Sequence, residues 1–306
     1  MADTETLDPP APLALPLTRL DTAFATFLND AQPSPDARHR LLAALTSHQF
    51  GRGHACLDLE ALQAHGVGAL GWTSQTQSLL PADLVAGAQT LPWAMGANSP
   101  LVLDGPRLYL RRNWSAEQSI QAAVAARLQQ RCPEPDNLAQ ALDQLFPGAT
   151  HCGAPDWQKI ACALATRARL TLITGGPGTG KTTTVVRLLA LLQSDAVRQG
   201  APLRIALAAP TGKAAARLGE SIASAVKRLP EAMQGHLPTQ AVTLHKLLDI
   251  RPNQGQDANF ELAVDLVIVD EASMIDLDMM ARLLAAVPLT ASLILLGDKD
   301  QLASVE

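Results

Sequence analysis

The chain has 306 residues, of which 47% are hydrophobic, 17% charged and 3% aromatic, and its formal net charge is −5. This composition excludes collagen-like, coiled-coil and wholly disordered proteins and is typical of a globular protein of about two domains. No apolar run reaches the roughly 18 residues of a membrane-spanning helix, so we expect a cytoplasmic protein. The negative charge also means that any contact with nucleic acid must be local.

Cysteine and histidine give no sign of a metal site or a disulfide framework. The cysteines stand far apart without a CxxC pair, and we expect them to fill apolar space: Cys56, Cys132, Cys152 and Cys162. The histidines of the first third have no ligand spacing either, and we assign them no chemistry: His39, His48, His54 and His65.

The first 112 residues predict a small mixed α/β domain. Residues 1–17 contain four prolines and indicate a flexible tail. Two helical patterns follow, near Leu20–Asn29 and Pro35–Ser47. The apolar runs Leu101–Leu103 and Leu108–Leu110 predict a hairpin that turns at Asp104-Gly105. The tryptophans of this part and of the segment directly after it are expected in the core: Trp72, Trp93 and Trp114.

Three helices are expected between this domain and the next apolar strand. Ser115 and Gln118 form a capping-box pattern, so a helix should begin at Ser115. A second helix should cover Asn137–Phe146. A third should open at Pro155-Asp156 and bury three apolar side chains at helical spacing: Trp157, Ile160 and Leu164.

Residues 113–306 predict an α/β fold with a parallel sheet and helices on both faces. Four continuous apolar runs indicate strands buried on both sides: Leu170–Thr174, Ile205–Ala209, Leu266–Val269 and Leu293–Leu296. Amphipathic helices separate them: Thr182–Gln193, Lys213–Leu229 and Leu277–Ala286. Ligands of such sheets bind at the carboxyl ends of the strands, so the residues that end these runs are the candidates for chemistry.

The first run ends in a phosphate-binding pattern, G-x-x-x-x-G-K-[ST]. Backbone N–H groups of this glycine-rich loop and of the following helix should surround phosphate oxygens. The residues expected to form this binding site are Gly175, Gly176, Pro177, Gly178, Thr179, Gly180, Lys181, Thr182 and Thr183. Lys181 should neutralise the β- and γ-phosphates. The Thr182 hydroxyl should hold Mg²⁺, which prefers oxygen ligands.

The third and fourth runs end in acidic and amide side chains. Asp270 should bind the metal ion or its water shell, and Glu271 is placed to act as a general base toward the attacking water. Taken alone, consecutive acids at a loop start are ordinarily solvated cap residues. After the fourth run, Gln301 could sense the γ-phosphate or orient water.

The second run ends in Thr211 and Lys213, inside a basic segment. Residues 196–230 contain six basic residues and one acidic residue. Thr211 can cap the following helix, and Lys213 and free N–H groups could then grip a nucleic-acid phosphate. A solvated helix face is the alternative reading of the same segment.

The order of these motifs resembles superfamily 1 helicases of the 5′-to-3′ class. The matching segments are Gln158, GGPGTGKTTT, APTGKAAARL, TLHKLL, VIVDEASMID and GDKDQLASVE. The residue sequences of these motifs are similar to those of RecD, the alpha subunit family of bacterial exodeoxyribonuclease V. Upstream, GRGHACLDLEAL and SPLVLDGPRLYLRRNW resemble the N-terminal domain of the same family.

The resemblance implies an ATP-dependent DNA helicase of a RecBCD-type exonuclease V, acting in double-strand break repair and recombination with RecB- and RecC-like subunits. Gln158 would contact the adenine edge, and Gln301 would couple the γ-phosphate to movement. Thr211, Lys213 and His245 match motifs that contact single-stranded DNA. Residues 1–112 would form an assembly domain and residues 113–306 the first RecA-like motor domain.

The chain departs from that family at its end. These motors have a second RecA-like domain whose arginines complete the ATP site, and this chain stops at Glu306, after the fourth motif. Without such an arginine, phosphoryl transfer can be ~10³–10⁵ slower. We therefore expect the chain to bind Mg-ATP, hydrolyse it poorly and unwind nothing. Two alternatives stay open: a P-loop kinase or DNA-independent ATPase, and a non-catalytic assembly module.

Overall fold

The computed structural model describes residues 15–81, 83–130, 132, 134–135, 137–147, 155–176, 178–227, 234–250 and 260–298. The chain forms two compact units that divide between Ser115 and Ala116. Cys152, Pro177, Gln301 and the tail up to residue 14 lie outside the described residues. Among the described helices, none is both long and apolar enough to cross a membrane.

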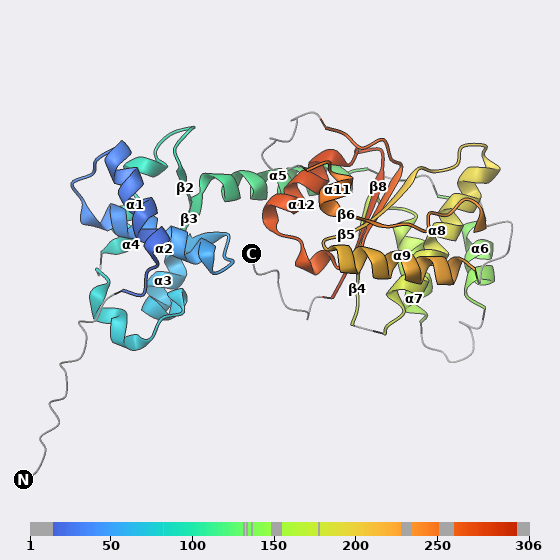
Figure 1. Cartoon of the computed structure of the whole chain (residues 1–306), viewed down its shortest axis with the longest axis horizontal. Helices are drawn as coiled ribbons and strands as arrows, with labels where there is room; N and C mark the ends of the chain where they lie inside the picture. Colours follow the sequence, from blue (N-terminus) through green and yellow to red (C-terminus); the bar gives the residue numbers. More distant parts are fainter. Residues whose placement is uncertain are drawn as a thin grey trace, which may run out of the picture. The chain divides into compact units, whose positions relative to one another are not determined.

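Unit 1 combines two packed helices with a small antiparallel sheet (Figure 1). α1 (Arg19–Ala31) and α2 (Ala37–Gly51) pack against each other, and the strands take the order β1 (Cys56–Asp58), β3 (Arg107–Leu110), β2 (Leu101–Asp104). Short helices connect them: α3 (Leu59–His65), α4 (Leu84–Ala88) and the 3₁₀ turns Gly66–Leu70, Ser74–Leu79 and Pro92–Ala94. The expected mixed α/β character is thus present.

The predicted hairpin forms, but its turn lies one residue later than expected. Asp104 pairs with Arg107 as the last rung of β2 and β3, so the two-residue loop is Gly105-Pro106. Gly105 has φ of 55°, a conformation that glycine adopts without steric cost. The Asp104 carboxylate instead accepts a hydrogen bond from the Trp114 indole at 3.0 Å.

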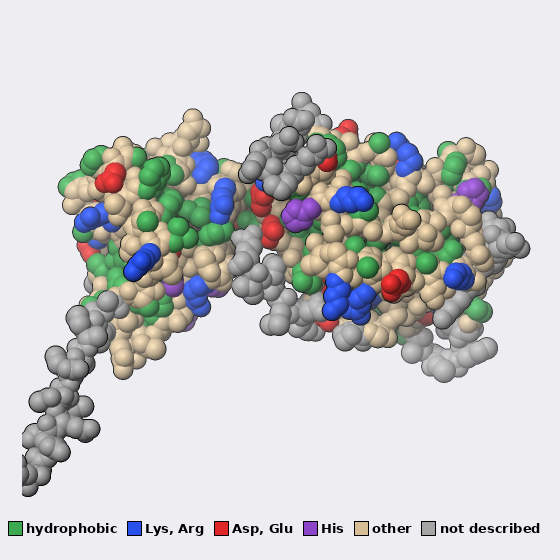
Figure 2. All heavy atoms as spheres, in the orientation of Figure 1, with side chains coloured by type: hydrophobic (Ala, Val, Ile, Leu, Met, Phe, Trp, Pro, Cys, Tyr) green, Lys and Arg blue, Asp and Glu red, His purple; other side chains and the backbone are tan. Residues whose placement is uncertain are grey.

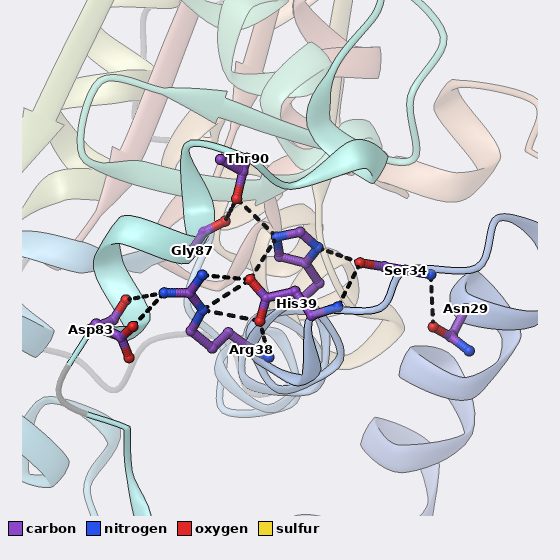
Figure 3. A network of polar contacts seen from close by, with 8 residues as sticks. Asn29, Ser34, Arg38, His39, Asp83, Gly87 and Thr90 are labelled. Carbon is purple, nitrogen blue, oxygen red and sulfur yellow. Dashed lines mark hydrogen bonds and ion pairs between the residues drawn. The ribbon is translucent and has the colours of Figure 1, made fainter.

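A polar network fixes the start of α2 (Figure 3). His39 is 5% exposed, and its two ring nitrogens lie 2.7 Å from Ser34 Oγ and 3.1 Å from Thr90 Oγ1. Arg38 lies between the carboxylates of Asp36 and Asp83. These contacts tie α2 to the segment around α4, so His39 has a structural part in unit 1.

The helix expected at Ser115 begins earlier. α5 (Arg111–Leu128) follows β3 without a loop, and Ser115 lies inside it, so the predicted cap is wrong. The Arg111 N–H donates to Pro100 O at 2.8 Å and Arg111 Nε donates to Ser99 O at 2.7 Å. The hairpin therefore holds the first residue of the helix, and no side-chain cap is needed there.

Unit 2 contains a five-stranded parallel sheet with helices on both faces (Figure 1), which confirms the predicted fold class. The strand order is β4 (Leu170–Thr174), β8 (Ser292–Gly297), β7 (Leu266–Val269), β5 (Ile205–Ala209), β6 (Val242–Thr243). The first four match the predicted runs. The two-residue β6 was not predicted, because two residues are too few to show a strand pattern.

Alternate residues of the central strands face opposite helix layers, as the twofold period of a strand requires. Leu266 and Ile268 of β7 join the core with α6 (Leu138–Leu145), α7 (Trp157–Ala165), α8 (Lys181–Arg198) and α9 (Gly212–Val226). Val267 and Val269 join the core with α5, α11 (Leu244–Leu247) and α12 (Leu277–Ala286). Both faces of the sheet are covered, which is why these strands read as continuous apolar runs.

α7 forms where it was expected, but the prediction of its buried face is wrong. Its large apolar side chains are exposed by 72%, 37% and 58%: Trp157, Ile160 and Leu164. Cys162 and Ala165 are buried instead, and the Cys162 thiol donates to Thr184 O at 3.5 Å. Small side chains let α7 approach α8 closely. The strand beside α7, β4, is an edge strand of the sheet.

Candidate nucleotide and nucleic-acid site

The phosphate-loop sequence connects β4 to α8 at the carboxyl edge of the sheet. Gly178 and Gly180 have φ of 79° and 83°, which glycine adopts readily and other residues rarely do. The Gly175 N–H donates to Gly297 O at 3.2 Å and so ties the loop to the end of β8. Thr179 Oγ1 donates to Gly176 O at 2.8 Å and closes the loop from within.

Lys181, the first residue of α8, folds back over this loop. Its ammonium donates to the carbonyl of Gly175, and to that of Gly176 at 3.5 Å. The first turn of α8 contains no acidic residue, so its free N–H groups and the lysine together present positive charge at the helix N-terminus. This arrangement fits an anionic phosphate group.

Asp270 and Glu271 follow β7, separated from β4 by β8. The Asp270 N–H donates to Ala208 O at 3.0 Å, which fixes the acid at the end of the β5–β7 pair. Glu271 has φ of 53°, unusual for a residue with a side chain, and its N–H donates to Asp270 Oδ1 at 2.9 Å. Such backbone strain is found preferentially at functional sites.

The donor set fits a magnesium ion shared with phosphates. Thr182 lies half-buried in the first turn of α8, and Asp270 is half-buried at the same edge of the sheet. Within the described residues, no group of three or more His, Cys, Asp or Glu is placed to hold a metal ion by itself. Mg²⁺ typically keeps waters and binds through one or two protein ligands plus substrate phosphates, so a hydroxyl and one carboxylate suffice.

Asp298 is a candidate site residue that the sequence reasoning missed. It follows β8, the strand next to β4, and a Cβ atom at Gly176 would lie 4.0 Å from its Oδ2. A Cβ atom at Gly297 would lie 3.3 Å from the Ser273 N–H nitrogen, so glycine lets this turn approach the segment after β7. The sequence signal that could have identified Asp298 is its place directly after a predicted strand.

Gln158 lies beside the phosphate loop. Its Nε2 donates to Thr179 O at 3.0 Å, and its Oε1 accepts from the Arg187 guanidinium at 3.4 Å. A Cβ atom at Gly180 would collide with the Gln158 amide, so this glycine also makes room for the side chain. Arg187 had no sequence signal, because it occupies an ordinary position on an amphipathic helix.

The candidate DNA residues follow β5 and β6, which are neighbours in the sheet. Thr211 caps α9 by accepting a hydrogen bond from the Ala214 N–H at 3.2 Å, and Lys213 in its first turn is exposed. His245 is exposed in α11, which begins directly after β6. Ala209 pairs with Thr243, so both segments leave the sheet at the same edge.

The carboxyl edge therefore has two parts. Candidate residues for phosphate and metal follow β4, β8 and β7, whereas candidate DNA contacts follow β5 and β6. On the face seen in Figure 2, basic side chains form separate groups within a largely uncharged surface. This pattern agrees with local contacts to nucleic acid rather than a continuous basic track.

Two family models match separate parts of the chain. Residues 15–109 match the N-terminal domain of RecBCD enzyme subunit RecD, and residues 158–306 match an AAA domain. The second match covers the phosphate loop and both acidic residues after β7, and it supports the use of a nucleotide by unit 2.

Curated relatives cover both parts at once. RecBCD enzyme subunit RecD of Mycobacterium tuberculosis is 41% identical over 280 residues, which are 89% of this chain and 46% of that protein. The RecD subunit of Haemophilus influenzae is 35% identical over 324 residues, covering 95% and 50%. The ATP-dependent RecD2 DNA helicase of Deinococcus radiodurans is 35% identical over 201 residues, covering 65% and 25%. The chain spans about half the length of the RecD relatives. The chain is thus similar to RecD subunits over most of its own length.

Proposed function

We propose that the chain is the part of an ATP-dependent 5′-to-3′ DNA helicase subunit that binds ATP and contacts DNA, in a RecBCD-type exonuclease V. The observation that carries this proposal is the shared location of its candidate residues at the ends of neighbouring strands. Lys181, Asp270 and Thr211 follow three strands of one parallel sheet, at the same edge. Ligands of such sheets bind at that edge.

In this proposal the phosphate loop and the first turn of α8 bind the triphosphate through backbone N–H groups. Lys181 would exchange its loop carbonyls for phosphate oxygens and neutralise their charge. Thr182 and Asp270 would hold Mg²⁺, which neutralises charge that develops on the phosphates during transfer. Glu271 would accept a proton from the attacking water, and Gln301 would couple the γ-phosphate to movement.

Thr211, Lys213 and His245 would contact the backbone of one DNA strand. Helix N-termini, hydroxyl groups and lysines are common phosphate-binding groups in proteins that bind nucleic acid. Unit 1 would attach the subunit to RecB- and RecC-like partners, as the match to the RecD N-terminal domain suggests. The assembly would act on DNA ends in double-strand break repair and recombination.

The DNA contact is tested by removing charge at the sheet edge. Arg217 is exposed on α9, one turn after Lys213. We expect Lys213→Ala combined with Arg217→Ala to weaken binding of a fluorescein-labelled dT oligonucleotide. The dependence of log K on log salt concentration should flatten by ~0.7 for each lost phosphate contact. Fluorescence anisotropy at several salt concentrations measures both quantities.

The matched control removes two arginines from the opposite edge. Arg198 ends α8 and Arg204 precedes β5, so both lie away from the carboxyl ends of the strands. Arg198→Ala combined with Arg204→Ala should leave the salt slope unchanged. Equal slopes for the two double variants would assign Lys213 and Arg217 to the solvated surface.

A further inference from the structure

The side chain of Gln158 is held between two partners of opposite chemistry. Arg187 has only donors, so it must face the amide oxygen, and the Thr179 carbonyl only accepts, so it must face the amide nitrogen. A flipped amide would lose both hydrogen bonds. The two partners together therefore fix which end of the amide points in which direction.

Arg187 is itself held in place. Its guanidinium lies 4.5 Å from the ring centroid of Phe146, which is 4% exposed. A planar guanidinium stacked on a buried ring keeps its hydrogen-bond donors in a fixed plane. Phe146 follows α6 and Gln158 lies on α7, so the stack links three helices of unit 2 through α8.

The fixed amide keeps unused hydrogen-bonding capacity. One Nε2 hydrogen and one Oε1 lone pair remain after the two contacts described above. A donor beside an acceptor matches the N7 and N6 edge of adenine, and glutamine pairs with that edge through two hydrogen bonds. Guanine presents two acceptors, N7 and O6, on the same edge, so a donor beside an acceptor can satisfy only one of them and disfavours this base.

We propose that Arg187 is a positioning residue for base selection, acting on the nucleotide only through the amide of Gln158. This inference rests on the proposed function, because it requires a nucleotide at the phosphate loop. Arg187 itself needs no contact with the base. Its role is to hold Oε1 so that the adenine edge, and not the guanine edge, meets a matching pair of groups.

The test compares binding of mant-ADP and mant-GDP to the whole chain. Arg187→Met keeps the aliphatic packing on Phe146 but removes every donor. We expect it to weaken mant-ADP binding by about three- to tenfold and mant-GDP binding little, so that the preference for adenine shrinks. The matched control is Arg198→Met on the same helix, where the arginine is exposed and paired with Asp195; it should retain the full preference.

A double-mutant cycle separates positioning from a general packing effect. In a Gln158→Ala background, Arg187→Met should change neither affinity, because the group through which it acts is gone. An effect of equal size in both backgrounds would overturn the inference and leave the nucleotide site intact. So would an unchanged adenine preference in Arg187→Met. A wild-type chain that binds neither nucleotide would overturn the proposed function itself and the inference with it.

Discussion

The carboxylate of Asp36 shows how one side chain can serve two structural purposes. It caps α2 by accepting a hydrogen bond from the Arg38 N–H at 2.9 Å, and it pairs with the Arg38 guanidinium at 2.6 Å. The hydrogen bonds from the Arg38 side chain are the main cause that lowers the pKa of Asp36 from 3.8 to about 2. The carboxylate thus favours the folded state in its charged form.

A pH titration of stability tests this interpretation. A lowered pKa in the folded state means that the stabilisation is complete above the ordinary value of 3.8 and is lost as the pH falls toward about 2. We expect the wild-type chain to resist urea better than Asp36→Asn above that range, and we expect the difference to narrow as the pH falls through the range. Tryptophan fluorescence reports this transition, since Trp93 in unit 1 is buried. A difference that stays constant across the range would contradict the assignment.

Single residues of the site were predictable to different degrees. Lys181, Asp270 and Glu271 stand in local patterns whose chemistry can be inferred without a structure. Arg187 has no such pattern, because its contact joins helices that are remote in sequence, and Asp298 had only its place after a strand. Residues that act through spatial neighbours leave no local signal, so the structure was needed to find them.

At the level of elements, the connection between α5 and α12 depends on a buried cation. Arg127 is 1% exposed and donates hydrogen bonds to Leu284 O at 3.0 Å and Val287 O at 2.6 Å, at the C-terminal end of α12. Burial lowers the pKa of this guanidinium. Cations at a helix C-terminus satisfy carbonyl groups that the helix itself leaves unpaired.

Removing this cation should destabilise unit 2. In Arg127→Met, the carbonyls of Leu284 and Val287 lose their donor in a buried place, and we expect a loss of about 1–3 kcal/mol in the free energy of unfolding. Arg282→Met, on α12, breaks only a partly exposed pair with Asp278 and should cost less than ~1 kcal/mol. Urea unfolding followed by circular dichroism measures both, and equal losses would contradict the role of Arg127.

The orientation of α7 gives a second prediction for an element. Leu164 is 58% exposed, whereas Leu188 of α8 is fully buried. Leu164→Ala should therefore change the free energy of unfolding by less than ~0.5 kcal/mol, and Leu188→Ala should lower it by about 2–5 kcal/mol. The same unfolding experiment compares them. A large loss of unfolding free energy in Leu164→Ala would contradict the exposed position of this side chain and would favour the sequence-based prediction that this face is buried.

Sequence patterns located elements better than they assigned faces. The helix Leu277–Ala286 was predicted to the residue, because caps and periodicity are local properties. The buried face of α7 could not be predicted in the same way, because the small residues Cys162 and Ala165 pack where α8 approaches closely. Which side of a helix meets its neighbour is decided by the whole sheet and its strand order.

For the molecule as a whole, the parallel sheet accounts for the position of the candidate site. Continuous apolar runs predicted four of its five strands, and polar strand ends predicted the edge where ligands bind. The strand order could not be read from the sequence, because β8 lies beside β4 although β5, β6 and β7 come between them in the sequence. That order is what brings Asp298 close to the phosphate loop.

The central claim is that the phosphate loop at this edge binds ATP with Mg²⁺, and calorimetric titration of Mg-ATP into the whole chain tests it directly. The wild-type chain should bind one nucleotide, and Lys181→Ala should lower the affinity about tenfold or more by removing a charged donor. Lys159→Ala, which breaks an ion pair with Asp143, should bind as the wild type does. A wild-type chain without saturable binding, or a Lys181→Ala variant of unchanged affinity, would contradict the account.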